Sequence, residues 1–184
     1  SSARFEHEMV VYLDKALRYY LADDGADASV AGNEELAWGV LDSQPKAISG
    51  GILVAAPSLD LDPLAADDAV IDTKALQGAW QERYAPCLVQ SASEPSDITS
   101  LSTAARRSGA HYLVQQHVAV KRVRDEADVL RIVLETSIYD AQGNLVTAVS
   151  KSTTSKRMTA LEAVCYLQFA TLRDLDTVFV IQNT

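Results

Sequence analysis

The sequence predicts an α/β (α+β) fold, with a mixed sheet and two leader helices before it. Three observations predict this fold. From residue 50 to residue 109, short apolar runs alternate with helical segments, which is typical of strands covered by helices. Residues 111–153 contain alternating segments joined by short turns, as in an antiparallel meander. An apolar helical pattern then follows Thr159.

The leader consists of two helical patterns. Asn33 is placed to cap the second, short helix, which Pro45 ends. Over residues 5–21, apolar residues recur at helical spacing, while Glu6, Asp14, Lys15 and Arg18 lie off this stripe. We expect a helical leader of residues 1–49 packed on a body of residues 50–184; the alternative is that the stripe faces a partner. The stripe comprises Phe5, Met9, Leu13, Ala16, Leu17, Tyr20 and Leu21.

The first half of the body has a β-α-β-α order. The apolar run Ile52–Ala56 predicts a strand buried on both faces. A long acidic loop is expected from Ser58 to about Asp72, and a helix from about Thr73 to Ala85. Cys87–Val89 predicts a second short strand. Asp97 is expected to cap a helix that ends at Gly109.

The second half predicts three long strands and a helix. Residues 111–124 and 129–139 alternate between apolar and polar side chains, and residues 145–153 follow a turn at Gly143. Thr159 and Glu162 have capping-box spacing at the start of a well-buried final helix. Residues 178–181 fit either a last strand or a continuation of that helix. One predicted face of the second strand comprises Leu130, Ile132, Leu134, Thr136 and Ile138.

Composition excludes two classes of protein. The formal net charge is -9, from 16 Lys and Arg against 25 Asp and Glu, so a nucleic-acid-binding footprint is not expected. The basic stretch Lys121, Arg122 and Arg124 runs into acidic residues and is interpreted as a solvated hairpin tip. No apolar run reaches the roughly 18 residues of a membrane span. We interpret the chain, which starts at Ser1 without a signal-like stretch, as processed or trimmed.

The two cysteines, Cys87 and Cys165, fit neither a disulfide scaffold nor a zinc motif. We expect two buried free thiols. The alternative, a disulfide between them, would imply an oxidising compartment.

No catalytic or cofactor site is predicted. Phosphate-binding loops, the nucleophile elbow and the zinc-protease motif are absent from the sequence. His111 and His117 fall on one strand, about 20 Å apart at about 3.3 Å per residue, so a structural or surface role is expected for each. We therefore expect no enzyme, no cofactor and no resident metal ion.

The acidic loop holds the weak candidates for a metal site. Its carboxylates follow the carboxyl end of the first strand, where open α/β sheets bind ligands, and hard cations prefer clustered carboxylates. Their spacing does not match the EF-hand, and Pro63 interrupts them, so a solvated loop is the simpler interpretation. The candidates are Asp60, Asp62, Asp67 and Asp68.

The segment from Ala104 to Val114, a helix ending in Gly-Ala-His-Tyr-Leu-Val before a long strand, carries a family resemblance. The strand Ile132–Asp140 continues it, with the turn at Gly143 and a return strand ending in Ser and Thr. Over about residues 50–175, the chain resembles the N-terminal domain of TolB and the lipoprotein activators of peptidoglycan synthases. The leader has no counterpart in this pattern, and the chain contains no lipidated cysteine.

The resemblance implies a non-enzymatic accessory domain of the bacterial cell envelope. Such a domain would bind an envelope protein in the periplasm or at the outer membrane, with a lipid anchor outside this chain. Two alternatives stay open at this stage. One is a small-molecule or metal-binding protein, or an enzyme, that uses the acidic loop. The other is a structural subunit of a secretion or motility assembly.

Overall fold

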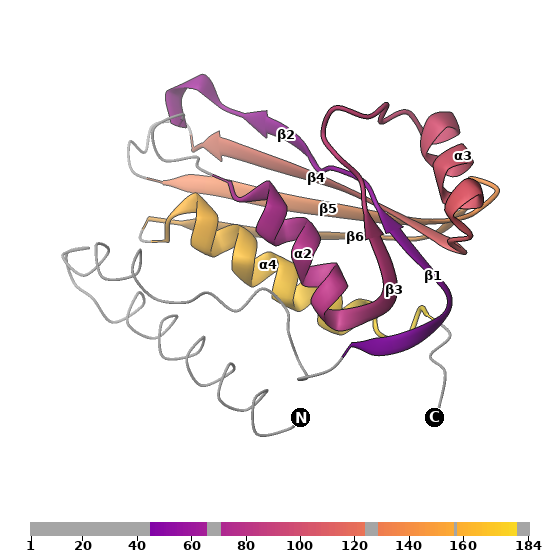
Figure 1. Ribbon diagram of the computed structural model, residues 1–184. Helices are drawn as coiled ribbons and strands as arrows, with labels where there is room; N and C mark the ends of the chain where they lie inside the picture. The colour runs from indigo at the N-terminus through magenta and orange to yellow at the C-terminus, as the bar shows by residue number, and fades with distance from the viewer. Residues whose placement is uncertain (1–44, 66–70, 124–128, 157, 180–184) are drawn as a thin grey trace.

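The computed structural model describes residues 45–65, 71–123, 129–156 and 158–179; both predicted leader helices lie outside these ranges (Figure 1). The strands of this part are β1 (Lys46–Val54), β2 (Ser58–Leu61), β3 (Tyr84–Val89), β4 (Tyr112–Arg122), β5 (Leu130–Asp140) and β6 (Leu145–Ser155). The helices are the short 3-10 helix η2 (Pro63–Ala65), α2 (Thr73–Arg83), α3 (Ile98–Ser108) and α4 (Ala160–Leu175).

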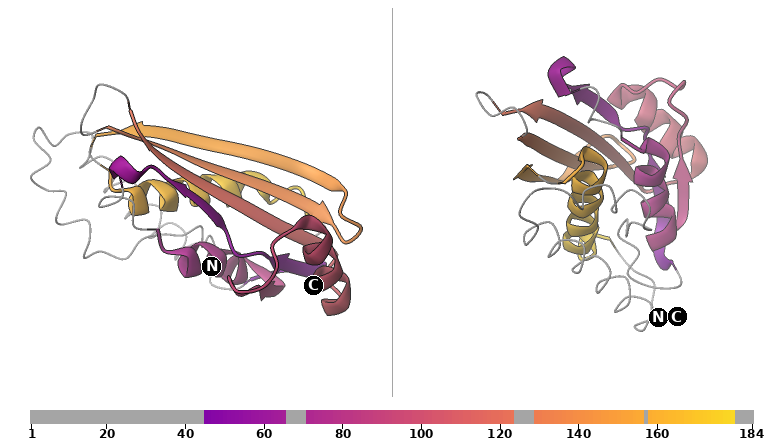
Figure 2. Two further views of the ribbon diagram at one scale, coloured as in Figure 1. Left: turned by 90° about the horizontal axis from the view of Figure 1, so that it is seen from above. Right: turned by 90° about the vertical axis from the view of Figure 1, so that its left-hand side faces the viewer.

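The described strands form one mixed sheet in the order β3-β1-β4-β5-β6. β1 runs parallel to both β3 and β4. β2 continues along β4 beyond the end of β1, again in parallel. The long strands β4, β5 and β6 form the predicted antiparallel meander and run side by side in both views of Figure 2. The predicted α/β (α+β) class is therefore confirmed.

The sheet corrects three predicted boundaries, one of which is the start of β3 at Tyr84 and not at Cys87. Ser58–Leu61 forms β2 instead of part of a loop, because its backbone pairs with β4, a partner 59 residues away at Ser58 and His117. β1 starts at Lys46 and not at Ile52. The sequence obscures this start because Gly50 and Gly51 take positive φ angles of 81° and 83°, and the β1–β3 register shifts across them.

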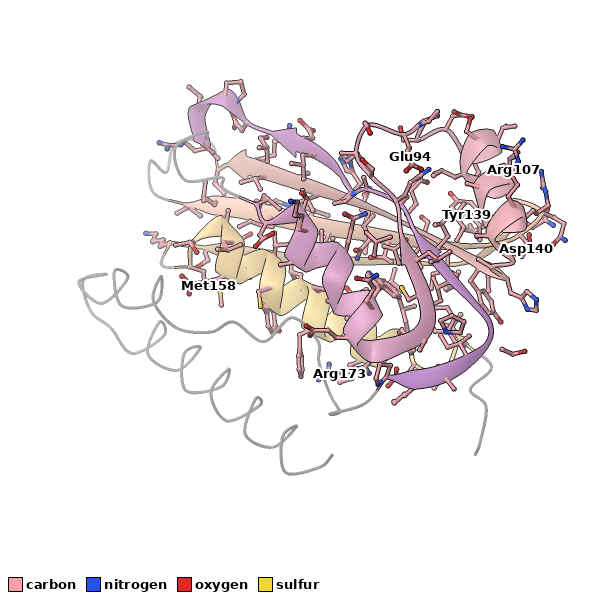
Figure 3. All side chains as sticks on the ribbon, viewed as in Figure 1. Glu94, Arg107, Tyr139, Asp140, Met158 and Arg173 are labelled. Atoms are coloured by element: carbon pink, nitrogen blue, oxygen red, sulfur yellow. The ribbon has the colours of Figure 1, made fainter. Side chains whose placement is uncertain are left out.

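Helices cover the two faces of the sheet unequally. α2 and α4 cover one face, where apolar side chains of β4 and β5 join α4 in the core. α3 covers the other face only at one end, where Leu101 and Ala105 pack with Leu53 and Leu113. Figure 3 shows Tyr139, at the end of β5, beside this helix. Among the described elements, helices therefore cover one face of the sheet and only one end of the other face.

The predicted ends of α3 and the predicted start of α4 are confirmed, whereas α2 ends at Arg83 and not at Ala85. The Asp97 carboxylate accepts a hydrogen bond from the Ser100 backbone N–H at 3.0 Å, and Gly109 ends α3 with a φ of 77°. The Thr159 hydroxyl accepts one from the Glu162 N–H at 3.2 Å. Of the tail, Val178 lies in a turn after α4 and not in a strand. Among the described helices, none combines the length and the hydropathy of a membrane span.

Candidate protein-binding surface

In the described part, the side of β4, β5 and β6 that faces away from α4 has a helix, α3, over one end only. We call this side the open face. Its side chains alternate with the core side chains along each strand, and none of them is buried. They are Gln115, His117, Ala119, Lys121, Arg131, Val133, Glu135, Ser137, Ala148, Ser150, Ser152 and Thr154.

The strand register places these side chains in rows across the sheet. His117 lies opposite Glu135, which lies opposite Ser150. The open face is therefore mixed in character, with hydroxyl groups concentrated on β6 and charged groups on β4 and β5.

The outer edge of β6 borders the open face. Within the described residues, β6 pairs with β5 alone, so the backbone groups on its other side have no strand partner there. The strand has 11 residues, with the sequence LVTAVSKSTTS, and contains no proline. Its one charged residue, Lys151, forms an ion pair with Asp174 of the α4 side. β6 thus lacks the prolines and outward charges that commonly protect sheet edges.

The histidine pair does not form one site. His117 contacts Ser58 of β2, with 2.6 Å between Nδ1 and the Ser58 Oγ. No hydrogen bond in the described part links His117 to its cross-strand neighbour Glu135, so a Ser-His-Glu relay is not assembled. His111 lies before β4 with its ring against Gly50. The two imidazoles therefore serve separate local contacts.

Asp60 and Asp62, the acidic candidates within the described residues, bind different partners. The Asp60 carboxylate pairs with Lys121 at 2.8 Å, and both side chains are half-exposed. The Asp62 carboxylate accepts hydrogen bonds from the backbone N–H groups of Arg122 and Leu64, each at 3.0 Å. These bonds, that from Arg122 first, lower the pKa of Asp62.

Asp67 and Asp68 lie outside the described residues. Within the described ranges, no three side chains of the metal-ligating types are grouped together. Asp60 and Asp62 instead attach the β2 segment to the end of β4.

The two cysteines are not joined in a disulfide bond, as the sequence predicted. Cys165 is 1% exposed on α4, and Cys87 lies partly buried on β3. Burial raises the pKa of the Cys87 thiol to about 12, so this thiol carries almost no thiolate at neutral pH.

Sequence reasoning found the strands of the surface but not the position of β6 at the edge. A strand pattern reports burial of alternate side chains, whereas edge position depends on which strands pair. The low charge of residues 145–155 was the one feature of the sequence that bears on this edge position.

No family model matches this sequence, and no curated protein matches it either. Solved structures do match. The LpoB C-terminal domain from Escherichia coli is 15% identical, covers 70% of this chain and 93% of its own, and has a TM-score of 0.41. Lipoprotein GNA1162 from Neisseria meningitidis is 14% identical, with 70% and 99% covered and a TM-score of 0.44.

TolB from Acinetobacter baumannii is 14% identical, with 78% of this chain and 31% of TolB covered and a TM-score of 0.35. These values describe a distant likeness of fold and transfer no binding site. The chain is similar in fold to TolB-like and LpoB-like structures, the group that residues 50–175 resemble.

Proposed function

We propose that this chain is a non-enzymatic accessory domain of the bacterial cell envelope that binds a protein partner through the outer edge of β6. The single observation that carries the proposal is the long, nearly uncharged β6 edge without a strand partner in the described part. The occupant we propose is an extended segment of an envelope protein that adds to the sheet as a further strand.

Strand addition fits the chemistry of this edge. Backbone N–H and C=O groups supply the affinity in this binding mode, and alternate side chains supply specificity. On β6 these alternate side chains are small, and Ser150, Ser152 and Thr154 can hydrogen-bond to a neighbouring strand. The periplasm or the outer membrane is the proposed location, supported by the sequence resemblance over residues 50–175.

The test uses the full chain as bait in a bacterial envelope extract, followed by binding measurements with the retained, purified protein. Adjacent variants Ser152→Pro and Thr153→Pro then probe the edge. Because successive N–H groups of a strand point to opposite sides, one proline removes an N–H from the β5 pairing and the other removes an outward N–H. Thermal melting identifies which variant keeps the β5 pairing.

We expect the variant that keeps its thermal stability to lose partner binding by at least about tenfold, which corresponds to about 1.4 kcal/mol. Glu135→Ala, on the open face but one strand away from the edge, is the control and should bind normally. If Glu135→Ala abolishes binding and the stable proline variant does not, the partner uses the open face and strand addition is wrong. Retention of this chain itself would identify a second copy as the occupant.

A further inference from the structure

We infer that the partner segment pairs antiparallel with residues 148–154 of β6 and places an apolar side chain beside Val149. This inference rests on the proposed strand addition and deepens it, because it assigns the register of the added strand and the chemistry of its two faces. Three features of β6 carry it: the direction of its backbone groups, the surroundings of its side chains and the ion pair beside them.

Backbone hydrogen bonds at the two ends of β5 determine which groups of β6 point outward. The Val123 N–H donates to the Val129 carbonyl at 2.9 Å, so Val129 directs its backbone groups toward β4. The Asp140 N–H donates to the Asn144 carbonyl, also at 2.9 Å, so Asp140 directs its backbone groups toward β6. Because successive residues of a strand direct N–H and C=O to opposite sides, the odd-numbered residues of β5 bond to β4 and the even-numbered residues bond to β6.

The register of β5 and β6 then assigns the outer edge. Ile132 lies opposite Thr153 and Leu134 lies opposite Lys151, so the odd-numbered residues of β6 bond to β5. The N–H and C=O groups of the even-numbered residues therefore point away from the sheet, at the edge that β6 forms in the left view of Figure 2. These residues, whose side chains are exposed on the open face, are Ala148, Ser150, Ser152 and Thr154.

The other face of the added strand meets the margin of the core. Val149 lies on the α4 side of β6 and packs against the core cluster that contains Ile138 and Leu172. It is only partly buried, because β6 is the last strand of the sheet in the described part. In an antiparallel pair, opposite residues that exchange no backbone bonds approach most closely, to about 4.5 Å between Cα atoms. The partner residue opposite Val149 is of this kind, so an apolar side chain there extends the core and buries more of Val149.

The charges and hydroxyl groups of β6 set the rest of the chemistry. Lys151, the one charged residue of the strand, is already neutralised by its ion pair with Asp174 and requires no acidic group from a partner. On the open face, Ser150 and Ser152 offer hydroxyl groups to a neighbouring strand. The segment that fits is therefore uncharged, with apolar side chains toward α4 and small polar side chains toward the open face. The antiparallel direction continues the meander and is the slightly more stable pairing per residue.

Hydrogen exchange in the free full-length chain tests the assigned edge without any partner. Residue-resolved NMR should show slow exchange for the amides of Val149, Lys151 and Thr153, which donate to β5. The outward amides of Ser150 and Ser152 should exchange at least about tenfold faster. Equal rates in the two sets, or the reverse alternation, would overturn the assigned register.

A peptide of alternating threonine and valine, flanked by lysines for solubility, is the probe for the added strand. A matched peptide carries threonine in place of every valine. The alternating peptide should bind the full-length chain at least about fivefold more tightly, because only its valines gain from apolar contact with Val149. Its binding should also slow exchange at the amides of Ser150 and Ser152. Binding that leaves these two amides unchanged would place the peptide elsewhere and contradict the inference.

A matched pair of substitutions tests which face of the segment is apolar. Val149→Thr keeps the shape of the side chain and should remove the preference for the alternating peptide. Val133→Thr, the same substitution on the open face, is the control and should keep that preference. The inference is wrong if Val133→Thr removes the preference and Val149→Thr does not, or if neither peptide binds at about 1 mM.

The proposed function fails through a different result. Strand addition itself is tested by the envelope extract and the proline variants, which do not depend on Val149. If an envelope protein is retained and needs the β6 edge, but binds the Val149→Thr chain as tightly as the unchanged chain, strand addition stands and the apolar contact is refuted.

Discussion

The side-chain amide of Gln116 on β4 donates a hydrogen bond to the side-chain carbonyl of Gln168 on α4 over 2.7 Å. Both residues are buried, at 3% and 0% exposure, so this pair connects sheet and helix inside the apolar core. The Trp80 indole N–H donates to the Gln116 carbonyl at 3.1 Å. The Gln168 amide also donates to the Leu76 backbone carbonyl at 2.8 Å, which brings α2 into the same network.

Removing Gln116 should therefore destabilise the protein beyond the loss of one contact. In Gln116→Leu, the buried N–H of Trp80 and the carbonyl of Gln168 lose a partner, and we expect the free energy of unfolding to fall by about 2–3 kcal/mol. Chemical denaturation measures this change. Gln115→Leu, whose exposed amide donates to the Ser96 carbonyl, is the control and should change stability by less than about 0.5 kcal/mol. Equal losses in the two variants would contradict the role of the network.

Gly50 should not tolerate a side chain. Its φ is +81°, and a Cβ there would lie 2.0 Å from the Cγ of His111. We expect Gly50→Ala to lower the free energy of unfolding by about 2 kcal/mol or more, from backbone strain and the steric clash together. A thermal melt measures the loss, and His111→Ala in the same chain should recover only the part due to the clash.

Gly78 provides the matched control for that substitution. It lies within α2, and nothing stands within 4 Å of the position of an added Cβ. Gly78→Ala should raise the free energy of unfolding by about 0.5–1 kcal/mol, because alanine is the better helix former. If Gly78→Ala also lowered the free energy of unfolding, the loss in Gly50→Ala could not be assigned to the strain and the clash at Gly50.

Asp176 should determine how the free energy of unfolding depends on pH in the acidic range. Burial acts to raise its pKa, but hydrogen bonds from Arg83, Lys46 and Tyr84 prevail and hold the pKa below the ordinary value of 3.8. The unfolded chain then takes up the proton at higher pH than the folded one. The stabilisation by Asp176 is therefore complete above pH 3.8 and is lost as the pH falls through the folded pKa.

Asp176→Asn should flatten this acid dependence and destabilise the protein by about 2–4 kcal/mol at neutral pH, because the ion pair of the nearly buried Arg83 with Asp176 is lost. The free energy of unfolding, measured from about pH 2 to about pH 7, checks both effects, because this range includes the usual pKa of a carboxylate. Asp174→Asn is the comparison. Asp174 also has a lowered pKa, but its side chain is 41% exposed beside Lys151, so its loss should cost less than about 1 kcal/mol.

The cap of α4 should contribute measurably to stability. Thr159→Ala removes the hydroxyl that accepts the Glu162 N–H and donates to the Glu162 carboxylate at 2.9 Å. We expect a loss of about 1 kcal/mol by chemical denaturation. Thr159→Ser keeps the hydroxyl and should retain most of that stability; a serine variant as unstable as the alanine variant would point to lost packing of the Thr159 methyl group instead.

Local signals in the sequence determined the helix caps and the meander. Asp97, Gly109 and Thr159 act on backbone groups within a few residues, so their side-chain chemistry is sufficient to place helix ends. The alternation along β5 reports one buried face, because successive side chains of a strand point to opposite sides. These short-range relationships predicted the fold class and also carried the resemblance from which the envelope expectation came.

The tertiary structure decided everything that depends on distant partners. β2 is a strand because it pairs with β4, although its four residues are too few to form a pattern. Gln116 is a core residue because α2 and α4 bring it Trp80 and Gln168, while the neighbouring Gln115 stays near solvent. The position of β6 at the edge, and with it the candidate surface, follows from strand order. Strand order is set by packing between segments far apart in the chain, which periodicity within one segment does not encode.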